Sequence, residues 1–132
     1  MRWISKRALL LLHDESLAQH GGASGIRDDG LLESALARPE NLLAYGSPDI
    51  VELAANYAYG LAKNHPFVDD NKRAAFLATG LFLALNGQRL VVAQAEATVM
   101  VLYLAAGEIT EAAFADCCER ICRRVQASTS FH

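Results

Sequence analysis

An uncharged stretch of 15 residues, 74–88, lies near the middle of the chain and sets the class of fold. A helix that spans a membrane needs about 20 apolar residues in succession, so this stretch is too short to be one. It contains Asn86 and Gly87, a pair typical of the end of a helix. Because a helix that is apolar on most faces must be buried, we expect residues 71–86 to form the central helix of a globular fold.

The rest of the sequence consists of helix-forming segments separated by breaks. Apolar residues at helical spacing predict further helices over about residues 5–20, 30–39, 49–64, 94–106 and 110–126. Ser5 and Thr110 are the predicted N-caps of the first and last of these, and Pro39 is predicted to end the second. Residues 88–93 are expected to be extended. The sequence therefore predicts an all-α fold, a compact helical bundle that forms one domain over residues 1–132.

Charge and composition exclude several classes of function. The 132 residues carry a formal net charge of −3, the pI is about 5.7, and the basic residues are spread evenly over both halves. Nucleic-acid-binding domains normally carry a basic patch, so we expect no direct contact with nucleic acid. The apolar run at residues 8–12 is too short for a signal peptide. We therefore expect a cytoplasmic protein with no membrane span.

The three cysteines, Cys117, Cys118 and Cys122, lie within six residues of one another. An odd and crowded set is a poor framework for disulfides, and the nearby sequence supplies no further ligands at the spacing of a zinc site. We expect these thiols to be buried and to pack as small apolar groups.

The segment HPFVDDNKR, residues 65–73, stands directly before the apolar helix. The first turn of a helix has about four main-chain N–H groups without partners and the positive end of the helix dipole, so it binds anions. Lys72 and Arg73 add two cations to this turn, where they are unfavourable for the helix unless an anion compensates them. The pattern indicates an anion site at the start of the apolar helix.

The same segment supplies groups for metal binding and proton transfer. Asp69 and Asp70 offer the oxygen ligands that Mg²⁺ prefers when it also holds a phosphate, and His65 is a base near neutral pH. Each residue taken singly also has an ordinary structural explanation, since an Asp before a helix is a common N-cap. Their concentration in nine residues favours phosphoryl or nucleotidyl transfer, which requires positioning and charge stabilisation.

HPFVDDNKR closely resembles the signature of Fic/Doc proteins, H-P-F-x-[DE]-G-N-G-R-x-x-R. It is most similar to the death-on-curing (Doc) branch, in which N-K-R replaces N-G-R. GIRDDGLLESALARP, residues 25–39, also resembles an early segment of that branch. The resemblance covers most of the chain, is most specific at residues 65–73, and implies a Fic/Doc-like helical bundle around a buried central helix.

The resemblance also implies roles for individual residues. His65 takes a proton from a target hydroxyl, Phe67 anchors the loop in the core, and Asp69 holds Mg²⁺. The phosphates of ATP are expected to be bound by the helix-end amides and by three side chains, Asn71, Lys72 and Arg73. The expected catalytic residues are His65, Asp69 and Arg73.

The resemblance further implies a toxin of a toxin–antitoxin pair. Fic enzymes move AMP from ATP onto a protein hydroxyl, whereas Doc proteins transfer the terminal phosphate to a threonine of elongation factor Tu and arrest growth. The cognate antitoxin folds its C-terminal segment onto the toxin. Lys72 replaces a Gly of the Fic signature and Phe76 replaces its second Arg, which removes a bidentate phosphate clamp. Both differences favour a Doc-like kinase over AMP transfer.

Asp70 stands where the family usually has Gly or Ala, and two alternatives are open. A carboxylate directed into the phosphate pocket repels ATP unless Mg²⁺ or Lys72 neutralises it, whereas one directed outward has no such effect. A second hypothesis is therefore a catalytically weakened module that binds its antitoxin. A third, a metal-dependent nuclease toxin that uses His65 and Asp69, is disfavoured because the chain lacks a basic surface for its substrate.

Overall fold

The structure, a computed structural model, describes residues 1–90 and 94–124. Within these ranges the helices are α1 (Lys6–His20), α2 (Asp29–Tyr45), α3 (Ile50–Asn64), α4 (Asn71–Leu85), α5 (Gln94–Ala106) and α6 (Glu111–Ile121). Two strands of three residues, β1 (Gln88–Leu90) and β2 (Cys122–Arg124), pair in antiparallel fashion. The predicted all-α class is confirmed, because the two short strands only join the end of α4 to the end of α6. None of the helices in the described ranges is long and apolar enough to cross a membrane.

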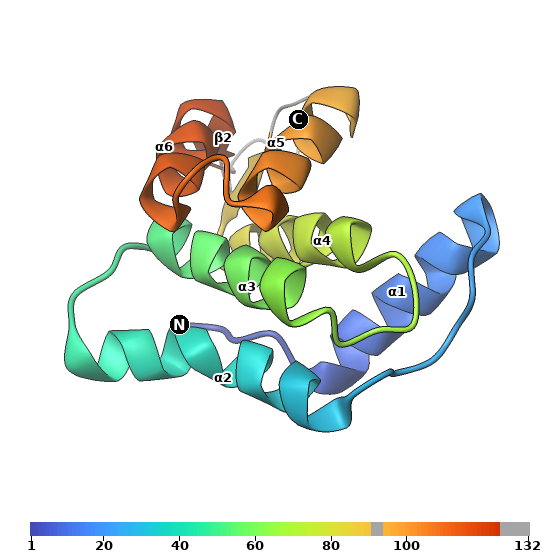
Figure 1. The fold of residues 1–132 in the computed structure, drawn as a ribbon. Helices are drawn as coiled ribbons and strands as arrows, with labels where there is room; N and C mark the ends of the chain where they lie inside the picture. The colour runs from blue at the N-terminus through green and yellow to red at the C-terminus, as the bar shows by residue number, and fades with distance from the viewer. Residues whose placement is uncertain (91–93, 125–132) are drawn as a thin grey trace, which may run out of the picture.

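The helices are arranged in three layers (Figure 1). α3 and α4 lie side by side in the middle layer. α2 packs on one side of α3, and α5 and α6 cover the other side. α1 packs against α4, near the end of the layer at which α3 connects to α4. This arrangement surrounds α3 and leaves the α3–α4 loop at one end of the bundle.

α3 is more deeply buried than α4, which corrects the prediction that residues 71–86 form the central helix. Ten of the 15 residues of α3 are buried, compared with six of 15 in α4. One cause is the close approach of α2, since a Cβ added at Gly60 of α3 comes within 3.3 Å of Ala35. α4 instead keeps a partly open side, on which Lys72 is exposed. The segment HPFVDDNKR, residues 65–73, therefore leads into this partly open helix.

α2 is longer than predicted. It continues to Tyr45 with Pro39 inside it, although Pro39 was expected to end the helix. Proline in a helix interior removes one hydrogen bond and costs about 3 kcal/mol in isolation. Pro39 is itself buried, and Leu43 in the following turn packs against the core. Tertiary packing therefore offsets the local preference.

α6 is shorter than predicted. It ends at Ile121 rather than at residue 126, because residues 122–124 pair with β1. The predicted N-caps are confirmed: the Ser5 hydroxyl accepts from Ala8 N at 3.1 Å, and the Thr110 hydroxyl accepts from Ala113 N at 3.0 Å.

The prediction of buried thiols is confirmed for Cys118 but not for Cys117. Cys118 is buried and Cys117 is half-buried, while the side chain of Cys122 lies outside the described residues. Among the residues that the structure describes, no group of three or more His, Cys, Asp or Glu side chains is arranged to hold a metal ion.

Candidate active site

Residues 65–73 form the loop between α3 and α4 and the first turn of α4 (Figure 1). Main-chain hydrogen bonds join this loop to residues 25–28, which connect α1 to α2. The carbonyl of Pro66 accepts from the N–H of Arg27 at 2.7 Å and from the N–H of Asp28 at 3.1 Å. The two segments that carry the family resemblance are thus adjacent in space, and one holds the other in place.

Phe67 anchors the loop in the core, as predicted. Its side chain is 1% exposed and stacks on the buried ring of His13, with ring centroids 3.9 Å apart. His13 Nε2 lies 2.9 Å from the carbonyl oxygen of Asp69, and since a carbonyl only accepts, Nε2 carries the proton. The side chain of Asn71 accepts from Phe67 N at 2.9 Å and donates to Phe67 O at 3.1 Å. Phe67, His13 and Asn71 together fix the path of the loop.

Asn71 therefore has a structural contact that the sequence did not indicate. Its Nδ2 donates one of its two protons to Phe67 O, and its Oδ1 accepts from Phe67 N. The second Nδ2 proton and the main-chain N–H of Asn71 are the groups left for the predicted phosphate contact.

His65 is exposed and ends α3 in an unusual backbone conformation. Its φ of 48° and ψ of 55° lie in the left-handed region, and its N–H donates to Leu61 O at 3.3 Å. This conformation costs a residue other than glycine about 1–2 kcal/mol. The guanidinium of Arg27 binds the carbonyl oxygens of Asn64 and His65, at 2.8 Å and 2.7 Å. His65 is therefore exposed at the C-terminal end of α3, where Arg27 holds its backbone in place.

The first turn of α4 lacks a side-chain cap. Asp70 occupies the N-cap position with φ 65° and ψ 32°, also left-handed, and its carboxylate does not cap the helix. The main-chain N–H groups of residues 71–73 meet no acceptor in the described part of the chain, and the first helical bond is from Ala74 N to Asp70 O. The left-handed φ explains physically why Gly is common at the position of Asp70 in the family pattern. The start of α4 is open to an anion.

Asp69 presents an exposed carboxylate beside this helix start. Its Oδ1 accepts from Asp70 N at 2.8 Å, and its Oδ2 accepts from Ala23 N at 3.2 Å. Each oxygen of an ionised carboxylate has two lone pairs, so each keeps one for a further partner. The donor set fits Mg²⁺ bound through one carboxylate, with phosphate and water oxygens completing its coordination.

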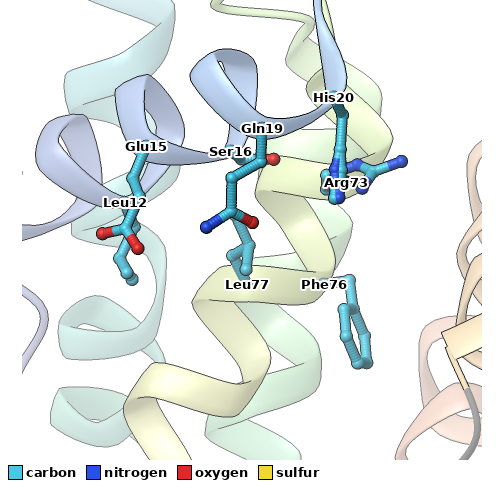
Figure 2. Close-up of a pocket in the computed structure, with 8 residues that line it drawn as sticks. All are labelled: Leu12, Glu15, Ser16, Gln19, His20, Arg73, Phe76 and Leu77. Carbon is cyan, nitrogen blue, oxygen red and sulfur yellow. Dashed lines mark hydrogen bonds between the residues drawn. The ribbon is translucent and has the colours of Figure 1, made fainter.

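Arg73 points from α4 toward α1 (Figure 2). Its Nη1 lies 2.9 Å from Nδ1 of His20, which accepts because a guanidinium only donates. Its Nε lies 3.5 Å from Oδ1 of Asp70, whose Oδ2 accepts from the Ser16 hydroxyl at 3.4 Å. The carboxylate of Asp70 thus faces Arg73 and α1. Lys72, the neutralising partner considered from the sequence, is exposed, and Arg73 takes that role instead.

A cleft of about 340 Å³ continues from Arg73 along the groove between α1 and α4 (Figure 2). Its lining combines five polar or charged side chains with three apolar ones. The lining residues are Leu12, Glu15, Ser16, Gln19, His20, Arg73, Phe76 and Leu77. Phe76 occupies the wall of this cleft at the position where the Fic signature has its second Arg.

Most of the residues predicted from the sequence meet at the start of α4. Asp69, Asp70, Asn71 and Arg73 are linked by direct contacts or by consecutive positions, whereas the side chains of His65 and Lys72 are exposed and form no side-chain contact with them among the described residues. The sequence missed Arg27, His13 and His20. Their contacts depend on tertiary packing, and only the helical spacing of His13 with Leu9 marked it as facing inward.

Comparisons with known proteins agree with this geometry. The Fic/DOC family profile matches residues 3–83. The chain is 35% identical over 122 residues to "Protein kinase doc" of Escherichia phage P1, covering 92% of this chain and 96% of that protein. It is 44% identical over 73 residues to "Toxin Doc" of Mycolicibacterium smegmatis, covering 53% of this chain and 55% of that protein. The chain belongs to the Fic/DOC family, in its Doc branch.

Proposed function

We propose that this protein is a Doc-type toxin that transfers the terminal phosphate of ATP to a protein hydroxyl. The observation that carries the proposal is the uncapped start of α4, with Arg73 in its first turn and the exposed imidazole of His65 on the same loop. The identity to a phage protein named a protein kinase, over 92% of the chain, supports the same reaction class.

The proposed reaction is a direct transfer. Nε2 or Nδ1 of His65 accepts the proton of the target hydroxyl, and the hydroxyl oxygen bonds to the γ-phosphorus. The bond from the γ-phosphorus to the β–γ bridging oxygen breaks, and ADP leaves with that electron pair. The N–H groups of residues 71–73 and the cations of Lys72 and Arg73 hold the phosphate charge.

Asp69 is the proposed Mg²⁺ ligand. Its carboxylate is exposed and retains lone pairs beside the open helix end. When bound, Mg²⁺ neutralises part of the phosphate charge. The N–H of Asp70 and the N–H of Ala23 orient the carboxylate of Asp69 for that contact.

The proposed target and partner follow from the family resemblance. We propose elongation factor Tu as the protein substrate, with growth arrest as the result. We also propose a cognate antitoxin whose C-terminal segment folds onto the toxin. The second relative, named a toxin, supports the pairing with an antitoxin.

Two alternatives rest on specific observations. AMP transfer is the first, and it is weakened because Phe76, and not an arginine, lines the cleft at the position of the second Arg. A binding module with little catalysis is the second, and the pairing of the Asp70 carboxylate with Arg73 favours it, since a phosphate has to compete with that carboxylate.

The test is transfer from labelled ATP to purified elongation factor Tu in the presence of Mg²⁺. We expect label from the γ position and none from the α position. His65→Ala is expected to lower the rate about 10²–10⁴-fold by removing the base. Arg7→Ala, at an exposed arginine of α1, is the matched control and should be unchanged.

Other outcomes identify the alternatives. Label from the α position alone shows AMP transfer. Absence of label, together with no growth arrest on induced expression, shows the binding module. Degradation of cellular RNA before arrest shows a nuclease and contradicts the proposed kinase.

A further inference from the structure

We infer that Arg27 is a positioning residue for His65, the proposed base, and this inference rests on the proposed function. Arg27 lies between α1 and α2, far from residues 65–73 in the sequence. It binds three consecutive carbonyl oxygens at the corner where α3 ends. None of these contacts involves ATP-binding groups, so Arg27 acts on the reaction only through the backbone of His65.

The three contacts use three different nitrogens of Arg27. Nη2 donates to Asn64 O at 2.8 Å, and Nε donates to His65 O at 2.7 Å. The main-chain N–H donates to Pro66 O at 2.7 Å. All three distances are at the short end of the range for N–H···O bonds. The peptide planes on both sides of the His65 Cα are therefore fixed by one residue.

We call the three contacts of Arg27 with the carbonyl oxygens of residues 64–66 the clamp. Two features of the end of α3 explain what this clamp contributes. The last carbonyls of a helix have no partners within the helix and carry its negative dipole end, so a cation there is favourable. His65 is also held in a left-handed conformation that an unrestrained residue other than glycine seldom adopts. Without the clamp, we expect the backbone at His65 to relax, and the direction in which the imidazole leaves the chain to change.

A lysine cannot replace this arginine. The planar guanidinium presents Nε and Nη2 in a fixed fork that reaches two neighbouring carbonyls at once, whereas an ammonium is a single point charge. The neighbouring contact from Asn64 Nδ2 to Leu31 O, at 3.0 Å, holds the end of α3 to α2 but does not touch His65. A substitution of Arg27 should therefore leave α3 folded but release the backbone of His65 at the end of this helix.

The experiment compares Arg27→Ala, Arg27→Lys and the control Arg7→Ala. We expect kcat of Arg27→Ala to fall at least tenfold, because small displacements of a reacting group carry large rate penalties. KM for ATP should stay within twofold, since Arg73 and the start of α4 are untouched. Methylguanidinium should restore part of kcat in Arg27→Ala, and methylammonium should not. Arg27→Lys should stay well below the wild type.

A purely structural role predicts different results. A loss of rate that disappears after correction for the folded fraction, or a kcat within twofold of the wild type, overturns the inference. A rise in KM at constant kcat overturns it as well.

A second measurement separates this inference from the proposed function. If the wild type transfers nothing from ATP, the proposed function fails, but hydrogen exchange at the His65 N–H still reports on the clamp. We expect that exchange, and the imidazole Cε1–H resonance of His65, to change in Arg27→Ala, with at least tenfold faster exchange. Both should be unchanged in Arg7→Ala. Unchanged exchange in Arg27→Ala overturns the inference whether or not the protein is a kinase.

Discussion

The N-termini of α3 and α4, neighbouring helices of 15 residues each, are built in opposite ways. At α3, the Asp49 carboxylate accepts from Glu52 N at 2.8 Å, and the Glu52 carboxylate accepts from Asp49 N at 3.0 Å. This capping box satisfies two main-chain donors. At α4, Asp70 makes no cap contact, and the first turn carries Lys72 and Arg73 instead of an acid.

The capped start of α3 stabilises its helix, whereas the uncapped start of α4 leaves main-chain N–H groups available to a ligand. Side chains also cap the starts of three further helices, and these caps are Ser5, Asp28 and Thr110. A missing cap costs about 1 kcal/mol of helix stability. Cations in the first turn add a further cost, because they face the positive end of the helix dipole. The chain thus accepts at α4 a cost that it avoids at the other described caps. An anion bound at α4 would offset that cost, which is the physical reason for our proposal that the phosphate binds at this end.

The largest effect that separates the two helix starts is expected at Arg73. Arg73→Ala removes a charged donor from the developing phosphate charge, so the transfer rate should fall by about 10²–10³-fold. The free energy of unfolding should change by less than about 0.5 kcal/mol, because partly exposed pairs contribute little. Initial rates and urea denaturation measure the two quantities. A rate equal to that of Arg7→Ala contradicts the assignment of the phosphate to α4.

The converse effect is expected at α3. Asp49→Ala removes the capping box and should lower the free energy of unfolding by about 1 kcal/mol, within a range of 0.5–2. The transfer rate per folded molecule should be unchanged. Asp49→Asn keeps a capping acceptor and is the matched control for urea denaturation. A loss of transfer in Asp49→Ala at full folding would mean that the two helix starts are not independent.

Helix positions could be predicted from the sequence wherever the local signals and the packing agree. Ser5 and Thr110 cap as expected because capping needs only the residues of the first turn. Pro39 misled the prediction for α2, since burial of Pro39 and Leu43 outweighs the missing hydrogen bond. The end of α6 was misplaced because pairing with β1, some 30 residues earlier, decides it.

The candidate site was predictable as far as it is continuous in sequence. His65, Asp69 and Arg73 lie in one nine-residue segment, so residue type and order sufficed to propose their chemistry. His13, in α1, and Arg27, in the connection between α1 and α2, both contact the same loop. No spacing rule relates them to the segment, because their contacts arise only after the helices pack.

A smaller effect is expected at Asp70, the acid at the open helix start. Asp70→Asn keeps a residue that tolerates the left-handed conformation but removes the charge that competes for Arg73. KM for ATP should fall by about two- to fivefold, the equivalent of a surface ion pair. Asp70→Gly should give the same change in KM and a higher free energy of unfolding, since glycine adopts this φ without strain. A higher KM for ATP in both variants would instead show that Asp70 holds Arg73 in position for ATP binding.

The smallest effect is the stabilisation of the folded protein by a simple anion. Tripolyphosphate at a concentration equal to its dissociation constant should raise the free energy of unfolding by about 0.4 kcal/mol. The same increment is expected in Asp49→Ala, because the open start of α4 is intact there, and none is expected in Arg73→Ala. Thermal denaturation with and without the anion measures all three. An equal increment in the wild type and in Asp49→Ala, together with none in Arg73→Ala, would place the anion at α4 independently of catalysis, because the stabilisation depends only on binding to the folded state. An increment that survives in Arg73→Ala contradicts this placement.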